Sequence, residues 1–545
     1  MAEPKEGLDP LIEALPPATD YLTYLTLVEY QLTPARLPIL HQVLQDETLT
    51  INIGWDLAVL EAYTEFPSTE TTAAILELLR DISGKKRPRL PPRSASEQAL
   101  TRPTGDTAAP DPEADEHVEG ESTDATNEKR LTQRLLQFGL IETLKTYLLQ
   151  CVDEPAPSGM QWALRMQEKL DPPRIQSRVA TCIEQFQNTE HLKERDTTLG
   201  KIVALSRDFG LETRDLQQII FKGENDHPPP LDFENVPKSP DDIPLERHGC
   251  ILLLAARCVT VTLFGSGARD YDLLLYPDIV NILLNFLGDY ESPYTAAAQE
   301  PTALIDSILS LAAVAKTSTS EQDTDEEGFK TLVYGLTACA RGPTQFRAFT
   351  RLGSIPARAF HAYPDIQVRY NLILEILNEE ESEYARLSAL QWLKEELISY
   401  STTLEDTDSG NPFSDPESFT FLFQSIYKFS HPVQSSPPSN VPEGITPRIW
   451  MEFVQEFAPL YLAKLNFYYF LCKSPKLAEQ LHIDTLLSIF DSKFLTPLKS
   501  FVSCLSENPA VSSHIEAELG DAAVQMGRNA ASVVLQIISD VTALA

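Results

Sequence analysis

The chain has 545 residues, of which 43% are hydrophobic and 23% charged, a composition typical of globular proteins. Because one hydrophobic core stops growing at roughly 250 to 300 residues, such a chain needs several domains or an extended repeat architecture. The formal net charge of -35 repels phosphate backbones and attracts basic partners, which argues against direct nucleic-acid binding.

The first segment, residues 1–83, is predicted to form N-terminal helical repeats. Its opening residues are acidic where a secretory signal peptide is positively charged, and no apolar stretch follows them. We therefore expect a cytoplasmic protein rather than a secreted one.

Residues 84–128 interrupt the helical pattern and are predicted to form a disordered linker, because Pro, Ser, Thr, Glu and Asp dominate. The linker begins with a basic run and continues with nine acidic residues and no Lys or Arg between positions 103 and 128. The basic run fits a short nuclear-import pattern, formed by Lys85, Lys86, Arg87 and Arg89. The alternative is that this run folds back on the acidic tract.

From residue 129 to 545 the apolar spacing is helical nearly everywhere. Three stripes illustrate it: Tyr370, Ile373, Leu374 and Leu377; Ile279, Ile282, Leu283 and Phe286; Val534, Ile537, Ile538 and Val541. Thr213 is predicted to be an N-cap residue. Long loops are predicted near 223–242, 316–328, 401–417 and 431–444.

The longest apolar stretch, Ile251–Gly265, contains Arg257 and is shorter than the roughly 20 residues that span a bilayer, so no membrane span is predicted. The glycine that ends this stretch, Gly265, is predicted to terminate a helix.

The order of Asp365, Val368 and Arg369 follows the opening of the second helix in HEAT-type repeats. Stacked helix pairs are an economical way to bury one stripe on every helix. The sequence therefore predicts an all-α fold, a HEAT/armadillo-like α-solenoid with a disordered acidic linker near its N-terminus. Residues 129–545 leave room for about nine or ten repeats of roughly 40 to 47 residues.

No phosphate-binding loop, dinucleotide fingerprint, zinc-protease helix or nucleophile elbow occurs in the sequence. We therefore predict no catalytic, cofactor-binding or metal-binding residues, and keep a helical enzyme with a non-local site as an alternative. Arg247 and His248 lie close enough to Cys250 to allow a reactive thiol, but burial on an apolar helix face is the favoured interpretation. The loop 317–327 fits the pattern of acid-directed kinases, and a merely soluble loop is the alternative.

One block resembles a known family. The segment NIGWDLAVLEAYTEF, Asn52–Phe66, resembles the start of the family of Yap-binding protein, aberrant root formation protein and glomulin, with Gly54, Trp55 and Asp56 as its most specific part. Later segments, HAYPDIQVRYNLILEIL and ARLSALQWLKEEL, are similar to that family's later helices, and the acidic linker is most similar to the fungal members. Trp55 is expected to be a helix-packing anchor and Gly54 a turn.

The resemblance implies a HEAT-like scaffold without enzyme activity or cofactor. Fungal members bind a basic-leucine-zipper transcription factor and promote its activation in the oxidative-stress response, a relative is associated with kinetochores, and glomulin binds a RING protein of cullin ubiquitin ligases. A basic-leucine-zipper factor is therefore the expected partner. A RING or ubiquitin-ligase component and a kinetochore role are the alternatives.

Overall fold

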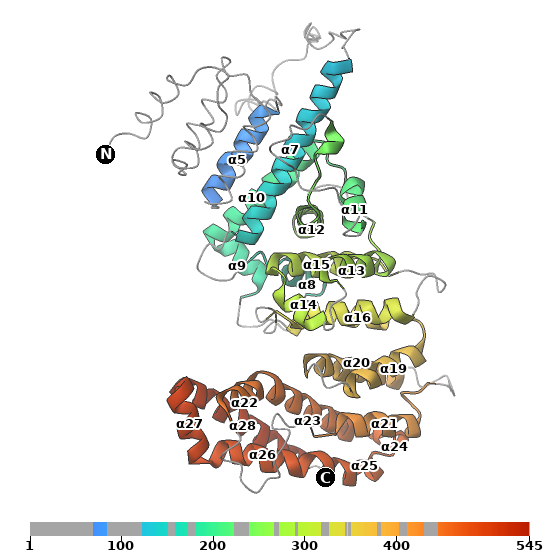
Figure 1. The fold of residues 1–545 in the computed structure, drawn as a ribbon. Helices are drawn as coiled ribbons and strands as arrows, with labels where there is room; N and C mark the ends of the chain where they lie inside the picture. The colour runs from blue at the N-terminus through green and yellow to red at the C-terminus, as the bar shows by residue number, and fades with distance from the viewer. Residues whose placement is uncertain are drawn as a thin grey trace, which may run out of the picture. The chain divides into compact units, whose positions relative to one another are not determined.

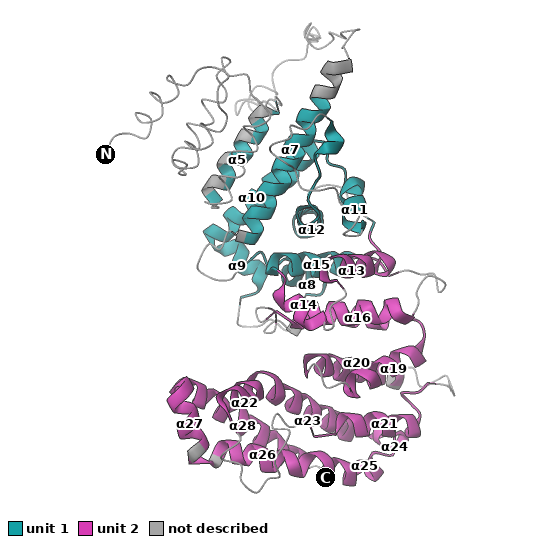
Figure 2. Cartoon of the chain, viewed as in Figure 1, with its two compact units in different colours: residues 1–272, 301–314 teal, residues 273–300, 315–545 magenta. Residues whose placement is uncertain are grey.

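The computed structural model describes residues 69–83, 123–150, 159–172, 180–222, 239–265, 272–288, 293–317, 326–343, 346, 350–378, 383–402, 411–429 and 445–543. Within these ranges all regular secondary structure is helical (Figure 1). One isolated parallel β-bridge joins Leu274 and Lys316. This confirms the all-α prediction. The chain divides into two compact units, residues 1–272 with 301–314 and residues 273–300 with 315–545 (Figure 2).

The first unit, called unit 1, is built from α-helices and one short 3-10 helix. Its described elements are α5 (Thr69–Ile82), α7 (Thr123–Gln150), α8 (Trp162–Leu170), α9 (Cys182–Asn188), α10 (Glu190–Asp208), α11 (Thr213–Phe221), η2 (Pro240–Asp242), α12 (Arg247–Phe264) and α15 (Thr302–Val314). Because α7 begins at Thr123, the last part of the predicted linker, 123–128, is helical.

Helix α12 lies at the centre of unit 1 and packs against α7, α8, α10, α11 and α15. It begins after Glu246, whose side chain accepts a hydrogen bond from the Gly249 N–H, and it ends at Gly265 with φ 65°. That left-handed conformation suits glycine, which confirms the predicted terminator.

Length and composition alone would allow α12 to cross a membrane, and among the described residues it is the one helix that meets this test. The sequence had predicted no span here. However, 67% of this helix is buried inside the protein, as is typical of a core helix in a globular unit.

Arg257 of α12 is 1% exposed and donates four hydrogen bonds to polar groups of the α10–α11 region. Two reach Ser206 Oγ at 3.2 and 2.7 Å, one reaches Thr213 Oγ1 at 3.1 Å and one the Leu211 carbonyl at 2.8 Å. The predicted N-cap role of Thr213 is wrong. The N-cap of α11 is Glu212, while the Thr213 hydroxyl serves as an acceptor for Arg257.

The N-terminus of α8 is capped by a residue that lies far away in the sequence. The Asp306 carboxylate on α15 accepts hydrogen bonds from the Trp162 and Ala163 N–H groups at 2.7 and 2.9 Å. Since the first N–H groups of a helix have no acceptor within it, these two bonds fix α8 against α15. Arg165 then extends from α8 and forms a bidentate ion pair with Asp196 of α10, at 2.9 and 2.6 Å.

The second unit, called unit 2, is a longer series of helices. Its described elements are η3 (Leu275–Ile279), α13 (Val280–Leu287), α14 (Pro293–Gln299), α16 (Glu326–Arg341), η4 (Thr350–Gly353), α18 (Ser354–His361), α19 (Ile366–Asn378), α20 (Glu383–Thr402), α21 (Pro416–Ile426), α22 (Pro447–Glu452), η6 (Phe453–Phe457), α23 (Ala458–Lys473), α24 (Pro475–Gln480), α25 (Ile483–Phe490), η7 (Asp491–Leu495), α26 (Thr496–Glu507), α27 (Pro509–Leu519) and α28 (Asp521–Thr542).

The predicted stripes and loops can be compared with these bounds. Tyr370, Ile373 and Leu377 are buried on α19. The stripe that ends η3 and continues on α13 is buried throughout, and on α28 Val534, Ile538 and Val541 are buried. Helices extend into two of the predicted loops. Helix α16 begins at Glu326, inside the loop predicted at 316–328. Helix α20 ends at Thr402 and α21 begins at Pro416, both inside the loop predicted at 401–417. The loop predicted at 431–444 lies outside the described residues.

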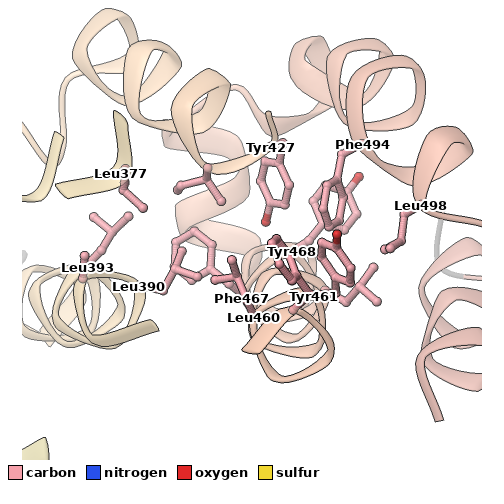
Figure 3. Packing of buried hydrophobic residues seen from close by; sticks show 14 of the residues in the cluster. Leu377, Leu390, Leu393, Tyr427, Leu460, Tyr461, Phe467, Tyr468, Phe494 and Leu498 are labelled. Carbon is pink, nitrogen blue, oxygen red and sulfur yellow. The ribbon is translucent and has the colours of Figure 1, made fainter. Parts of the chain in front are cut away.

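Aromatic rings fill the centre of the C-terminal half of unit 2 (Figure 3). Tyr468 of α23 stacks on Phe490 of α25 with ring centroids 3.8 Å apart, and Tyr427 meets Phe490 edge to face at 4.9 Å. The Tyr427 and Tyr461 rings also lie against Phe494 of η7. Each such ring pair contributes about 0.5 to 1.5 kcal/mol beyond the area it buries, so this cluster holds α21, α23 and α25 together.

The C-terminal helix α28 is fixed by close contact with Trp450 of α22. The indole Nε1 donates a hydrogen bond to the Ala523 carbonyl at 2.9 Å. The ring also lies over Gly527, where an added Cβ would be 2.1 Å from Trp450 Cζ2. Only glycine leaves room for this approach.

Candidate protein-binding site

The residues that the sequence singled out are not placed by the structure. The import segment Lys85, Lys86, Arg87 and Arg89 and the motif Gly54, Trp55 and Asp56 all lie outside the described residues. Both therefore stay predictions.

The buried thiols of the described residues are poorly suited to nucleophilic chemistry. Cys182, Cys250, Cys258 and Cys339 are buried. Burial raises the pKa of Cys182 and of Cys339 to about 12, and raises that of Cys250 further. These thiols therefore stay protonated at neutral pH. Because the thiolate is the reactive form of cysteine, they are poor nucleophiles. The favoured interpretation of Cys250 as a packing residue is confirmed.

Two histidines of the described residues, His248 and His361, bind carboxylates. His248 pairs with Glu246 at 2.7 Å, and His361 lies between Glu395 and Glu396 at 2.8 and 2.9 Å. Within the described ranges no group of three or more His, Cys, Asp or Glu side chains could hold a metal ion. The chemistry that these residues offer is therefore charge pairing.

The HEAT-like signature at the start of α19 builds a charge network with α18 and α20. Asp365 Oδ1 accepts hydrogen bonds from the Gln367 and Val368 N–H groups and so caps α19. Arg369 donates to both oxygens of Glu396 at 2.9 and 3.2 Å, and also to the Tyr363 carbonyl. The signature therefore fixes the helix pair α19–α20.

His361 joins this network from the end of α18. Its partial burial opposes protonation, but the hydrogen bonds to Glu395 and Glu396 outweigh that effect and raise its pKa to about 9. His361 is therefore cationic at neutral pH and helps to hold α18 on α20.

At the other end of α19 carboxylates outnumber cations. Lys330 of α16 contacts Glu375 of α19 at 2.8 Å and Glu326 at 3.4 Å, and Glu327 is exposed beside them. The hydrogen bond to Glu375 raises the pKa of Lys330. We call the set Glu326, Glu327, Lys330 and Glu375 the acidic corner.

Two further acidic segments adjoin the helices of the acidic corner in the sequence. Residues 318–325 precede α16, and residues 379–382 follow α19. Together these segments contain six carboxylates and no Lys or Arg: Glu321, Asp323, Asp325, Glu379, Glu380 and Glu381. Lys330 links the start of α16, which follows the first segment in the sequence, to the end of α19, which precedes the second. Sequence reasoning missed this site, since the two segments are more than fifty positions apart.

Comparison with known proteins gives one match. A model of the family described as "Uncharacterised protein family, YAP/Alf4/glomulin" matches residues 1–60 and 57–527. No curated protein and no solved structure matches the chain.

Proposed function

The chain belongs to the YAP/Alf4/glomulin family, and from this premise we propose that it is a non-enzymatic scaffold that binds a basic segment of a partner protein. The proposed partner is a basic-leucine-zipper transcription factor of the oxidative-stress response, and the proposed segment is its DNA-contacting basic region. The proposed architecture is an α-solenoid. Supporting it, α16 packs on α18 and α20, α20 packs on α19 and α23, and α23 packs on α28.

The observation that carries this proposal is the acidic corner. Two carboxylates there, Glu326 and Glu375, contact one lysine, and the exposed Glu327 follows Glu326 in the sequence. The adjoining sequences add six more carboxylates without a cation. A basic helix would meet an attractive potential at this place, in addition to the overall charge of -35.

Titration of the full-length chain into a labelled synthetic peptide rich in Arg and Lys tests the proposal. The affinity is expected to fall about tenfold between roughly 50 and 200 mM NaCl, because exposed charges are screened. The double variant Glu326→Gln, Glu327→Gln should bind at least about threefold more weakly. The matched control, Glu516→Gln with Glu518→Gln on α27, should bind as the unmodified chain does. A salt-insensitive complex, or an equal loss in the control, would rule out the acidic corner.

The buried thiols suggest which molecule reacts with peroxide in such a complex. Because burial keeps Cys182, Cys250 and Cys339 protonated, we propose that the oxidised thiols belong to the partner. Affinity purification with and without peroxide, followed by partner identification, would also test the alternatives. Recovery of a RING protein together with inhibition of ubiquitin transfer would favour the glomulin-like role, and mitotic localisation would favour the kinetochore role.

We also propose that the protein is cytoplasmic and that Lys85, Lys86, Arg87 and Arg89 allow nuclear entry. Deletion of residues 85–89 from a fluorescent fusion should reduce its nuclear fraction. Unchanged entry would instead favour the interpretation that the run folds back on the acidic tract.

A further inference from the structure

The seam between α20 and α23 of unit 2 presents cationic and apolar side chains together. The two helices run parallel, because Tyr384 near the start of α20 donates to the Gln455 carbonyl at 3.3 Å, while Gln480, just beyond α23, donates to Tyr400 near the end of α20 at 3.0 Å. Residues in the last turns of both helices therefore share one surface.

Large apolar side chains are exposed along this seam. Ile398 of α20 is 41% exposed and Tyr469 of α23 is 42% exposed. Phe470 is partly buried beside them. Solvent-exposed residues of this size are common when scattered singly. Here Ile398 follows Lys394 by one helical turn, and Lys394 reaches the Phe470 ring, which is next to Tyr469 in the sequence.

Lysines lie over the same rings. Lys394 Nζ of α20 is 5.1 Å from the centroid of the Phe470 ring, and Lys473 Nζ is 5.6 Å from the centroid of the Tyr469 ring. Lys476 follows on α24 and is exposed. We call the set Lys394, Ile398, Tyr469, Phe470, Lys473 and Lys476 the seam patch. The rings restrain two of its ammonium groups through cation–π attraction.

The charge of the seam patch is opposite to that of the chain. In the part of the chain that the structure describes, none of its three lysines has a carboxylate within ion-pair distance. The neighbouring Glu395 is bound by His361 and Gln391. The exposed Glu479 on α24 and the exposed Asp484 on α25, whose charge acts on Cys472, are two carboxylates against three ammonium groups. The described ammonium groups therefore outnumber these two carboxylates within a chain of net charge -35.

We propose that the seam patch binds an acidic peptide segment of a partner protein, one that carries an aromatic or large aliphatic side chain. Its carboxylates would pair with the lysines, and its apolar side chain would cover Ile398 and Tyr469, excluding water from the ion pairs. A polyphosphate ligand fits less well, because the rest of the chain repels it and the patch contains no arginine. This site is independent of the acidic corner, whose ligand has the opposite charge.

Fluorescence anisotropy with the full-length chain tests this inference. The probe is a labelled synthetic peptide with Asp and Glu on both sides of a central Phe-Leu pair. Charge reversal by Lys394→Glu with Lys473→Glu should weaken binding about tenfold or more, and Ile398→Ser with Tyr469→Ser should have a comparable effect. The matched control, Lys493→Glu with Lys499→Glu at other exposed lysines of unit 2, should change the affinity less than about twofold.

Three outcomes would overturn the inference. Equal losses in the control would show a general charge effect, equal affinity for a polyglutamate peptide would show that the apolar side chains are unused, and equally tight binding of single-stranded DNA would show a nucleic-acid site. Thermal unfolding by circular dichroism verifies that the variants fold. The seam-patch variants should bind the basic peptide as tightly as the unmodified chain does. That outcome would show that the loss of acidic-peptide binding is independent of the proposed function.

Discussion

At position 527 the protein tolerates no side chain, because the Trp450 ring occupies the space above α28. We expect Gly527→Ala to lower the free energy of unfolding by about 1 to 3 kcal/mol, since the new Cβ would lie 2.1 Å from Cζ2 and force the indole to move. Urea-induced unfolding measures the change. An unchanged midpoint would mean that Trp450 rearranges without cost.

The same substitution at Gly200 is the matched control. This glycine lies inside α10, and an added Cβ would meet no atom within 4 Å. Gly200→Ala should therefore raise the free energy of unfolding by about 0.5 to 1 kcal/mol through reduced chain entropy.

Arg257 offers a second prediction. Replacement by Met would keep most of its volume but leave Ser206 Oγ, Thr213 Oγ1 and the Leu211 carbonyl without their donor. We expect a loss of about 2 to 4 kcal/mol in the free energy of unfolding. Arg207→Met, at an exposed position on α10, should change it by less than about 0.5 kcal/mol. Similar losses in both variants would contradict a specific role for Arg257.

The roles of single residues were predicted correctly where they depend on the local sequence pattern. They were predicted wrongly or missed where they depend on residues far away in the sequence. The burial of Cys250 and the termination of α12 at Gly265 follow from the apolar stripe and from glycine itself. Thr213 has the residue type of an N-cap, but its hydroxyl is bound by Arg257, more than forty positions away. Asp306 is a cap that no local rule reveals, because its helix follows the capped one by well over a hundred residues.

Among the helices, the pair α18–α20 gives a pH-dependent prediction. His361 has a folded-state pKa of about 9, above the usual 6.5 of histidine, so its contribution to stability is complete below about pH 6.5 and is lost as the pH rises through 9. Because its side chain is 32% exposed, solvent screening limits the contribution to roughly 1 to 2 kcal/mol.

Comparison of His361→Gln with the unmodified chain tests this. The variant should be less stable at pH 6, and the difference should shrink by pH 9.5. His514→Gln, at an exposed position on α27, should show no such trend. A difference that stays constant with pH would assign the effect of His361 to packing rather than to charge.

Helix positions were largely predictable, whereas the surfaces they form were not. The stripes on α13, α19 and α28 were predicted from a period of 3.6 residues. The start of α16 was predicted too late, because Glu326 and Glu327 count as loop residues by composition yet are favourable at the positive end of a helix dipole. The acidic corner and the seam patch each combine two helices, and single-sequence patterns do not pair helices.

For the whole molecule, the dominant property is the charge of -35. Self-repulsion of the carboxylates opposes compaction, so the unfolding temperature should rise by roughly 2 to 5 °C when NaCl is increased from about 10 to 150 mM. KCl should act equally, since screening depends on ionic strength. A falling unfolding temperature would instead mean that specific ion pairs, such as Arg165–Asp196 and Arg369–Glu396, outweigh the repulsion.

The chain passes between its two units three times, after residues 272, 300 and 314. The segment 273–300 belongs to unit 2, yet the following α15 returns to unit 1 and supplies the Asp306 cap of α8. A single protease cut at one crossing divides the chain into two fragments, and the other two crossings still link segments of one unit to segments of the other. Neither unit corresponds to one continuous stretch of sequence, so a truncation at residue 272 would remove α15 and expose the apolar face of α12.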